Sequence, residues 1–188
     1  MLTDRFVTAT QLALQWHATQ IRKGTAIPYT SHVLGVASLV LEHGGNEDQA
    51  IAGLLHDAIE DVGPHVAPLI AQHFGAEVLR IVEACTDGVP DAQGIKPDWH
   101  QRKTAYLAHL EQTDRAVLLV SCCDKLYNAR ATLADLHEIG AIVFSRFSAG
   151  KDGTLWYYRQ LSDIFSARLK NRLSGEFSRT VDSICVQP

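Results

Sequence analysis

The sequence predicts an all-α fold, a bundle of about eight helices in a single domain. Apolar residues recur with the 3.6-residue period of an α-helix along most of the 188 residues, and hardly any stretch alternates strictly as a strand does. Residues that favour helix ends separate these segments, and no repeat or low-complexity segment interrupts them. Because 46% of the residues are hydrophobic, the chain can bury a substantial core as one globular unit.

The first half of the chain predicts three longer helices followed by two shorter ones. They are expected at residues 3–21, 30–43, 47–61, 66–73 and 76–84. Pro28 marks a loop before the second helix, and Gly75 separates the last two. Asn46 can cap the third helix, with Gln49 at the capping-box position.

The second half of the chain predicts the longest polar loop and four more helices. The loop starts at Asp87 and runs to about Pro97. The helices are expected at residues 99–110, 114–136, 154–173 and 176–184. Asp98 can cap the first of these, Gly140 ends the second, and residues 150–153 form a turn before the third.

Composition narrows the kinds of partner that we expect. The formal net charge is −4 and no run of five like charges occurs, so we expect no nucleic-acid partner. No apolar run approaches the roughly 18 residues that span a bilayer, and the N-terminus lacks a signal pattern, so we expect a cytoplasmic protein without a membrane partner. The cysteines lack zinc-type spacing and predict buried, reduced thiols.

Four ionisable residues lie within six positions of an otherwise apolar helix. His56 and Asp57 are adjacent, and Glu60 and Asp61 follow one helical turn later. An unpaired buried carboxylate costs several kcal/mol or takes up a proton, so these groups need a partner. A metal ion is one such partner.

Two further residues complete a candidate set of metal ligands. A site for a divalent ion favours imidazole nitrogens and carboxylate oxygens, and His56 and Asp57 supply one of each. His32 begins the second helix and Asp124 interrupts a strongly apolar helix. His32 could instead be a capping or packing residue, and Asp124 could instead form a buried ion pair with Lys125 or Arg130.

The order His32, His56-Asp57, Asp124 resembles the HD superfamily of metal-dependent phosphohydrolases. The surrounding residues resemble, more narrowly, the hydrolase domain of the RelA/SpoT-homologue family. The matching segments are residues 18–24, 28–32, 54–61, 74–78 and 124–128. The resemblance covers about residues 5–135, and we expect residues 136–188 to form a helical extension of the same domain, 1–188.

The resemblance implies a metal-dependent chemistry. In that family, residues matching His32, His56, Asp57 and Asp124 ligate one divalent ion, typically manganese. Glu60 and Asp61 match the family's catalytic acidic pair. The spacing agrees with this role, because Glu60 lies one turn beyond a ligand and can orient an attacking water and take its proton. The alternative is a pair of solvated carboxylates, which would oppose the helix dipole at this end.

The resemblance also implies contacts with a nucleotide. Arg22, Lys23 and Asn128 match positions that face the nucleotide in the family, although two cations at a helix C-terminus are also favourable without a ligand. Beyond the resemblance, Lys151 and Tyr157 could close the pocket by charge and stacking, whereas an aromatic cluster on a helix can equally be core.

One departure from the family pattern concerns recognition of the base and ribose. The segment after Asp124 carries an extra residue, so Ala131 occupies the position of a substrate-contacting threonine.

Three functions compete at this point. The first is hydrolysis of the 3′-pyrophosphate of (p)ppGpp, or of a close relative, which makes a small-molecule nucleotide the partner. The second is an HD-type nucleotidase or phosphatase acting on another phosphorylated nucleotide, such as a 2′- or 3′-phosphate or NADPH. The third is a nucleotide sensor without turnover, although none of the matched ligands or acidic residues is missing. The sequence is compatible with a homodimer.

Overall fold

The computed structural model describes residues 1–88, 95 and 97–187, and this part of the chain is mostly helical. Its helices are α1 (Asp4–Trp16), α2 (Thr30–Glu42), α3 (Glu47–Leu55), α4 (Ala58–Asp61), α5 (Ala67–Phe74), α6 (Ala76–Cys85), α7 (Trp99–Gln112), α8 (Arg115–Ile139), α9 (Gly150–Arg168) and α10 (Arg172–Cys185), with 3-10 helices η1 (Pro64–Val66) and η2 (Gly140–Arg146). The prediction of an all-α fold is confirmed. The predicted polar loop lies largely outside the described residues.

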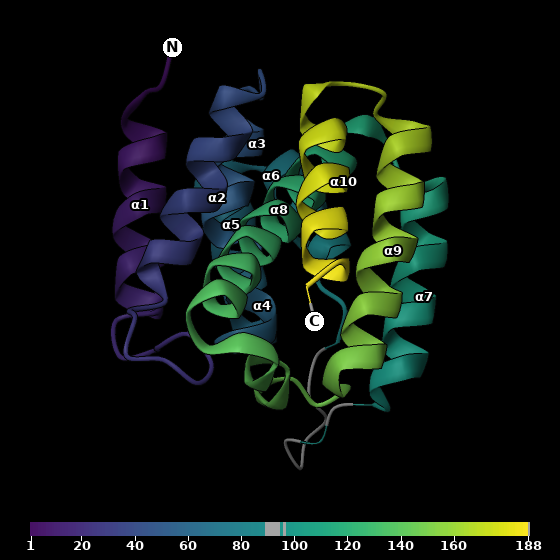
Figure 1. Ribbon diagram of the computed structural model, residues 1–188. Coiled ribbons are helices and arrows are strands. Elements are labelled where there is room, and N and C mark those ends of the chain that lie inside the picture. The colour runs from purple at the N-terminus through teal and green to yellow at the C-terminus, as the bar shows by residue number, and fades with distance from the viewer. Residues whose placement is uncertain (89–94, 96, 188) are drawn as a thin grey trace.

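Helix α8 lies in the middle of the bundle (Figure 1). It packs against α2, α3 and α6 on one side and against α9 and α10 on the other. Residues 117–124 are buried without exception, because neighbouring helices surround this part of α8. Asp124 therefore carries a carboxylate into the centre of the protein.

The segment from residue 47 to residue 61 is not one helix, and that prediction is wrong. The predicted capping box is present, since Gln49 N–H donates to Asn46 Oδ1 at 3.0 Å. However, α3 ends at Leu55, and Asp57 has φ −97° and ψ −2°, away from the regular α-helical values of about −63° and −42°. Adjacent side chains of a regular helix point about 100° apart, so this break is what allows Asp57 to turn toward the side chain of His56.

The chain between α1 and α2 differs from the prediction as well. Helix α1 ends at Trp16 and does not continue to Ile21. Residues 17–29, here called the 17–29 connection, turn back on themselves, and Ile21 and Pro28 form an isolated antiparallel bridge. The connection is therefore a compact loop held by its own backbone.

Glycines and caps delimit the helices in the middle of the chain as predicted. Gly75 has φ +89° and separates α5 from α6, and Gly140 has φ +69° at the end of α8. Asp98 accepts a hydrogen bond from a backbone N–H group at the start of α7, as predicted. Asp114, which was not predicted as a cap, does the same at the start of α8.

Two predicted boundaries near the C-terminus are wrong. Residues 150–153 form the first turn of α9 and are not a separate turn. The helix predicted to reach residue 173 ends at Arg168, because Asn171 caps α10 in a capping box with Ser174, with Oδ1 accepting from Ser174 N–H at 3.1 Å. None of the helices in the described part of the chain is both long and apolar enough to cross a membrane.

Candidate metal centre and substrate pocket

The four side chains predicted to ligate a metal ion lie side by side in the structure. His32 belongs to the first turn of α2, and Asp124 to the middle of α8. His56 and Asp57 occupy the break between α3 and α4. The Nε2 atoms of the two histidines are 3.2 Å apart. Oδ2 of Asp57 lies 2.9 Å from His56 Nε2, and Oδ1 of Asp124 lies 3.3 Å from His32 Nε2.

The arrangement fits a divalent metal ion. Two ligands that are each about 2.1 Å from an ion and at right angles to each other are about 3 Å apart, close to the spacings observed here. Two imidazole nitrogens that face each other inside a protein need a proton or a cation between them, because neither can otherwise donate to the other. His32 and His56 are each only 1% exposed, so water does not supply that partner freely.

Contacts on the far side of each imidazole ring fix its orientation. His56 Nδ1 lies 2.9 Å from the carbonyl oxygen of Gly53, which can only accept, so Nδ1 carries a hydrogen. Nε2 is therefore the atom that His56 offers to the cluster formed by His32, His56, Asp57 and Asp124. The ring of His32 packs against that of Tyr127, with centroids 5.1 Å apart. Gly35 permits this approach, because a Cβ atom there would overlap the Tyr127 ring.

The two oxygens of Asp124 have different partners. Oδ1 faces the imidazoles and accepts a hydrogen bond from Asn128 Nδ2 at 2.7 Å, one helical turn further along α8. Oδ2 accepts from Lys125 Nζ at 2.7 Å. The structure therefore contains the ion pair with Lys125 that the sequence left open, together with the approach of Asp124 to the histidines.

Neighbouring groups keep both carboxylates of the cluster ionised. Burial would raise the pKa of Asp57, but His56, together with a hydrogen bond from His32, holds it well below its usual value. Burial also opposes ionisation of Asp124, whose pKa is lowered well below the usual value by Lys125 and then by His56. The cluster thus offers negative charge to a cation despite its burial.

Tyr29, in the 17–29 connection, contacts the cluster. The sequence did not predict this contact. Its hydroxyl donates a hydrogen bond to Asp57 Oδ2. Burial and then the charge of Asp57 raise the pKa of Tyr29 far above its usual value, so the hydroxyl keeps its proton and acts as a donor. The only signal in the sequence was its position three residues before His32.

The two residues of the predicted acidic pair on α4, Glu60 and Asp61, face different parts of the protein. Glu60 lines a pocket beside the cluster. Asp61 is exposed, and its Oδ2 accepts a hydrogen bond from Gln20 Nε2 at 2.8 Å, so it faces the 17–29 connection. Consecutive side chains on a helix point in different directions, which accounts for the division.

Two pockets beside the cluster share part of their walls. Their volumes are about 460 Å³ and about 150 Å³. The shared side chains are those of Arg22, Lys23, Asn128, Thr132 and Phe147. The larger pocket adds mainly basic and aromatic residues, namely Trp99, Arg102, Lys103, Lys125, Tyr157 and Tyr158. A cationic pocket in a chain of net charge −4 favours an anionic ligand.

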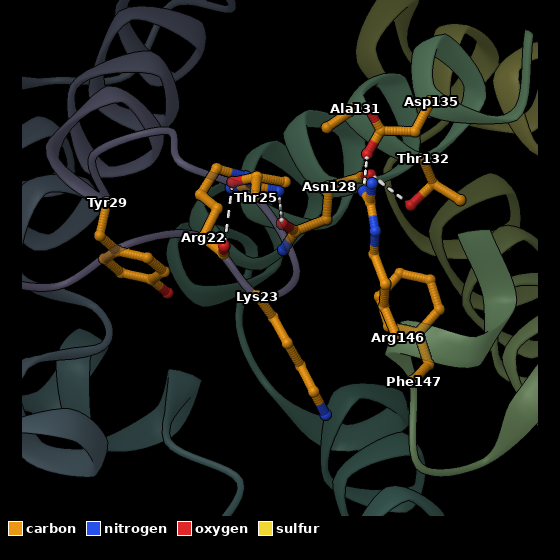
Figure 2. A pocket seen from close by; sticks show the side chains of 10 residues that line it. All are labelled: Arg22, Lys23, Thr25, Tyr29, Asn128, Ala131, Thr132, Asp135, Arg146 and Phe147. Atoms are coloured by element: carbon orange, nitrogen blue, oxygen red, sulfur yellow. Dashed lines mark hydrogen bonds and ion pairs between the residues drawn. The ribbon is translucent and has the colours of Figure 1, made fainter. Parts of the chain in front are cut away.

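Figure 2 shows the side chains that line the smaller pocket, where Arg22 Nη2 donates to Asn128 Oδ1 at 3.0 Å. The amide nitrogen of Asn128 in turn donates to Asp124, a member of the cluster. Arg146 reaches toward the same pocket and pairs with Asp135. A hydrogen-bonded chain therefore links a pocket arginine to a predicted metal ligand.

Only some of the residues predicted to contact the substrate line these two pockets. Arg22, Lys23 and Asn128 line both pockets, and Tyr157 lines the larger one. Lys151 lines neither pocket, and its Nζ lies 5.8 Å from the ring centroid of Phe144. Ala131, which the sequence placed at a threonine position, lines the smaller pocket, and the neighbouring Thr132 lines both.

Sequence reasoning missed the basic pair at the start of α7. Arg102 and Lys103 line the larger pocket, and both form ion pairs with Asp87, whose side chain is 7% exposed. Lys103 Nζ also lies 4.9 Å from the ring centroid of Tyr157. Asp87 lies at the start of the predicted polar loop and α7 follows that loop, so neither periodicity nor spacing indicated that they would meet.

Comparison with known proteins gives a consistent picture. Residues 9–155 match the family model described as HD domain. A guanosine-3′,5′-bis(diphosphate) 3′-pyrophosphohydrolase of Xenopus tropicalis is 38% identical over 125 residues, and the human enzyme of the same name is 33% identical over 127 residues. Each match covers 65% of this chain and 66% of the relative, so the chain matches slightly less than two thirds of these relatives.

The fold is also found among solved structures. A structure described as that of a metazoan orthologue of SpoT, which hydrolyses ppGpp and plays a role in starvation responses, superposes with a TM-score of 0.74. The superposition covers 98% of this chain and 95% of that one, at 20% sequence identity, and it establishes the likeness of the fold.

Proposed function

This chain belongs to the HD domain family, and from that premise we propose that it is a metal-dependent pyrophosphohydrolase that converts ppGpp to GDP and pyrophosphate. The single observation that carries the proposal is the cluster of His32, His56, Asp57 and Asp124 beside a cationic pocket. The relatives named for this reaction add support, since each match covers 65% of this chain.

The four clustered side chains would hold one divalent ion, for which we propose manganese. Nitrogen and oxygen donors together suit manganese and other first-row divalent ions. The ion would supply Lewis-acid charge at the reacting phosphate and lower the pKa of the attacking water.

Glu60 acts as the general base in this proposal. It lines the larger pocket, from which a carboxylate can take a proton from water as that water attacks the phosphorus bound to the ribose 3′-oxygen. The bond between phosphorus and the 3′-oxygen breaks, the 3′-oxygen leaves with a proton as a hydroxyl, and pyrophosphate is released. Asp61 completes the acidic pair next to it.

The basic residues of the pockets bind the phosphate groups. Arg22 is held by Asn128 and stacks over Tyr127 at 5.3 Å, which fixes its planar guanidinium at the pocket wall. Lys23, Lys103 and Lys125 add charge around the same space. Trp99 and Tyr157 offer aromatic surface for the base, and Lys151 stays a proposal for closure of the pocket from α9.

One experiment tests this function against its closest rival. Metal-stripped protein is incubated with manganese and, separately, with ppGpp, 3′-phosphorylated nucleotides and NADPH, and the leaving group is identified. Release of pyrophosphate from ppGpp supports the proposal. Release of orthophosphate from the other compounds alone would replace it with a nucleotidase, and binding without turnover of any compound would replace it with a sensor.

A further inference from the structure

A short series of hydrogen bonds runs from the protein interior to the acidic pair. His17 Nδ1 lies 2.6 Å from Gln20 Oε1, and Gln20 Nε2 lies 2.8 Å from Asp61 Oδ2. His17 is 1% exposed, Gln20 is half-buried, and Asp61 is exposed at the last position of the four-residue helix α4. The series thus connects a buried side chain to an exposed one.

The chemistry of the three groups assigns the direction of each hydrogen bond. An ionised carboxylate only accepts, so Gln20 must present its NH₂ group to Asp61. The amide oxygen of Gln20 then faces His17, and Nδ1 of His17 must carry a proton to donate to it. Each group therefore dictates the orientation of the next, and no other assignment leaves both contacts as hydrogen bonds.

Burial shows that His17 does not occupy its position for stability alone. Its Nε2 is buried and has no hydrogen-bond partner within the part of the chain that the structure describes, a cost that an apolar residue would avoid. The His17 ring lies against Tyr29, with centroids 5.2 Å apart, and Tyr29 N–H donates to the carbonyl oxygen of Gln20 at 2.9 Å. His17 is therefore held by the same connection that carries Gln20.

We propose that His17 and Gln20 are a positioning pair that holds the Asp61 carboxylate in one orientation for the reaction. The hydrogen bond from Gln20, itself held by the buried His17, favours one orientation of the exposed Asp61 carboxylate before the substrate binds. This inference rests on the proposed function only for its kinetic consequence. The hydrogen-bond series itself is a property of the free protein.

Kinetics of ppGpp hydrolysis test the consequence. Gln20→Leu and His17→Leu should each lower kcat about tenfold or more while KM stays within about twofold, as expected when a supporting residue outside direct contact is lost. His17→Asn, whose amide can donate from the position of Nδ1, should recover most of the activity. The exposed Gln11→Leu on α1 is the matched control and should behave as the wild type.

A double variant tests whether the pair acts through Asp61 or affects the protein in some other way. Gln20→Leu combined with Asp61→Asn should be no slower than Asp61→Asn alone, because the pair acts through Asp61. A rise in KM at unchanged kcat would mean that the pair supports the substrate-binding Arg22 and Lys23 and would overturn the proposal. Independent effects of the two substitutions would overturn it too.

A second measurement needs no activity and no metal. Long-range proton–nitrogen NMR of the full chain, with the His17 signal assigned from the His17→Asn variant, should find a proton on Nδ1, and the Gln20 side-chain amide resonances should move in Asp61→Asn. A His17 ring protonated on Nε2 alone, or Gln20 resonances unaffected by Asp61→Asn, would refute the pair even if the protein hydrolyses ppGpp. The expected spectra in a protein that leaves ppGpp intact would refute only the proposed function.

Discussion

The hydroxyl of Tyr29 donates a hydrogen bond to Oδ2 of Asp57, the oxygen that lies 2.9 Å from Nε2 of His56. This contact joins the 17–29 connection to the predicted metal ligands and orients a carboxylate that the helix break has already turned inward. Partners of this kind contribute to metal affinity by holding a ligand in place before the ion binds.

Tyr29→Phe should therefore weaken metal binding while leaving the fold intact. The substitution removes one hydrogen bond to Asp57 but keeps the ring, and we expect manganese affinity to fall about tenfold. Competition with a metal chelator measures the change. Tyr158→Phe, which removes a hydroxyl that lies 3.3 Å from Thr132, is the control and should bind manganese as the wild type does. Equal affinity in both variants would show that Tyr29 does not support the site.

Glu60→Gln should abolish most turnover without loss of the metal. The amide keeps the size of the side chain but cannot take a proton from water, and loss of a general base typically costs about 10²–10⁴-fold in rate. Metal content by elemental analysis and kcat with ppGpp check the two parts. Glu138→Gln, at the exposed end of α8, serves as the control. Undiminished turnover in Glu60→Gln would refute the role of Glu60.

Lysine at position 22 should not fulfil the role of arginine. A lysine keeps the charge but cannot hold both the hydrogen bond to Asn128 and the planar stack over Tyr127, so we expect KM to rise about tenfold with a smaller change in kcat. Initial rates over a range of ppGpp concentrations measure both constants. A lysine variant with wild-type KM would mean that only charge matters at this position.

Asp87→Asn should destabilise the protein in a way that depends on pH. Burial would raise the pKa of Asp87, but Lys103 and Lys125 lower it below the ordinary value of 3.8. A carboxyl whose pKa is lower in the folded state stabilises the fold above about pH 3.8, and this contribution is lost as the pH falls through the folded-state pKa. We expect the variant to be about 2 kcal/mol less stable at pH 7.

Urea unfolding at pH 7 and at successive values below pH 4 tests this expectation. The difference between wild type and Asp87→Asn should shrink toward the acid end, because the wild-type carboxyl becomes protonated and loses its attraction to Lys103. The exposed Asp163→Asn on α9 provides a reference substitution. A difference that stays constant across this range would show that Asp87 stabilises the protein by some means other than its charge.

Much of the fold could be predicted because helix ends carry local signals. The Asn46 and Gln49 capping box and the glycines at 75 and 140 lie where the sequence indicated. The break at Asp57 could not be predicted, since the carboxylate contacts Tyr29 and His32 from distant parts of the chain, and periodicity does not report such contacts. The start of α10 was missed although Asn171 carried a local capping signal, because the apolar pattern continues through Leu173.

The candidate site, like the fold, contains residues that could be predicted from the sequence and residues that could not. Charged residues within apolar helices, such as Asp124, can be recognised from the sequence because their burial demands a partner, and the family resemblance supplied the set. Residues that act through long-range contacts had no such signal. Asp87 meets Lys103 across a loop, and Gln20 meets Asp61, which is 41 residues away in the sequence, so only the structure reveals these contacts.

His32 and Asp124 belong to helices that are far apart in the sequence, and the cluster exists only when α2, α8 and the break between α3 and α4 have assembled. A bound ion would cross-link these distant segments, whereas the unfolded chain has no preformed place for it. Resistance to heat and denaturant would then rise with the free concentration of the ion, and a cell short of that metal would hold a less durable protein as well as a less active one.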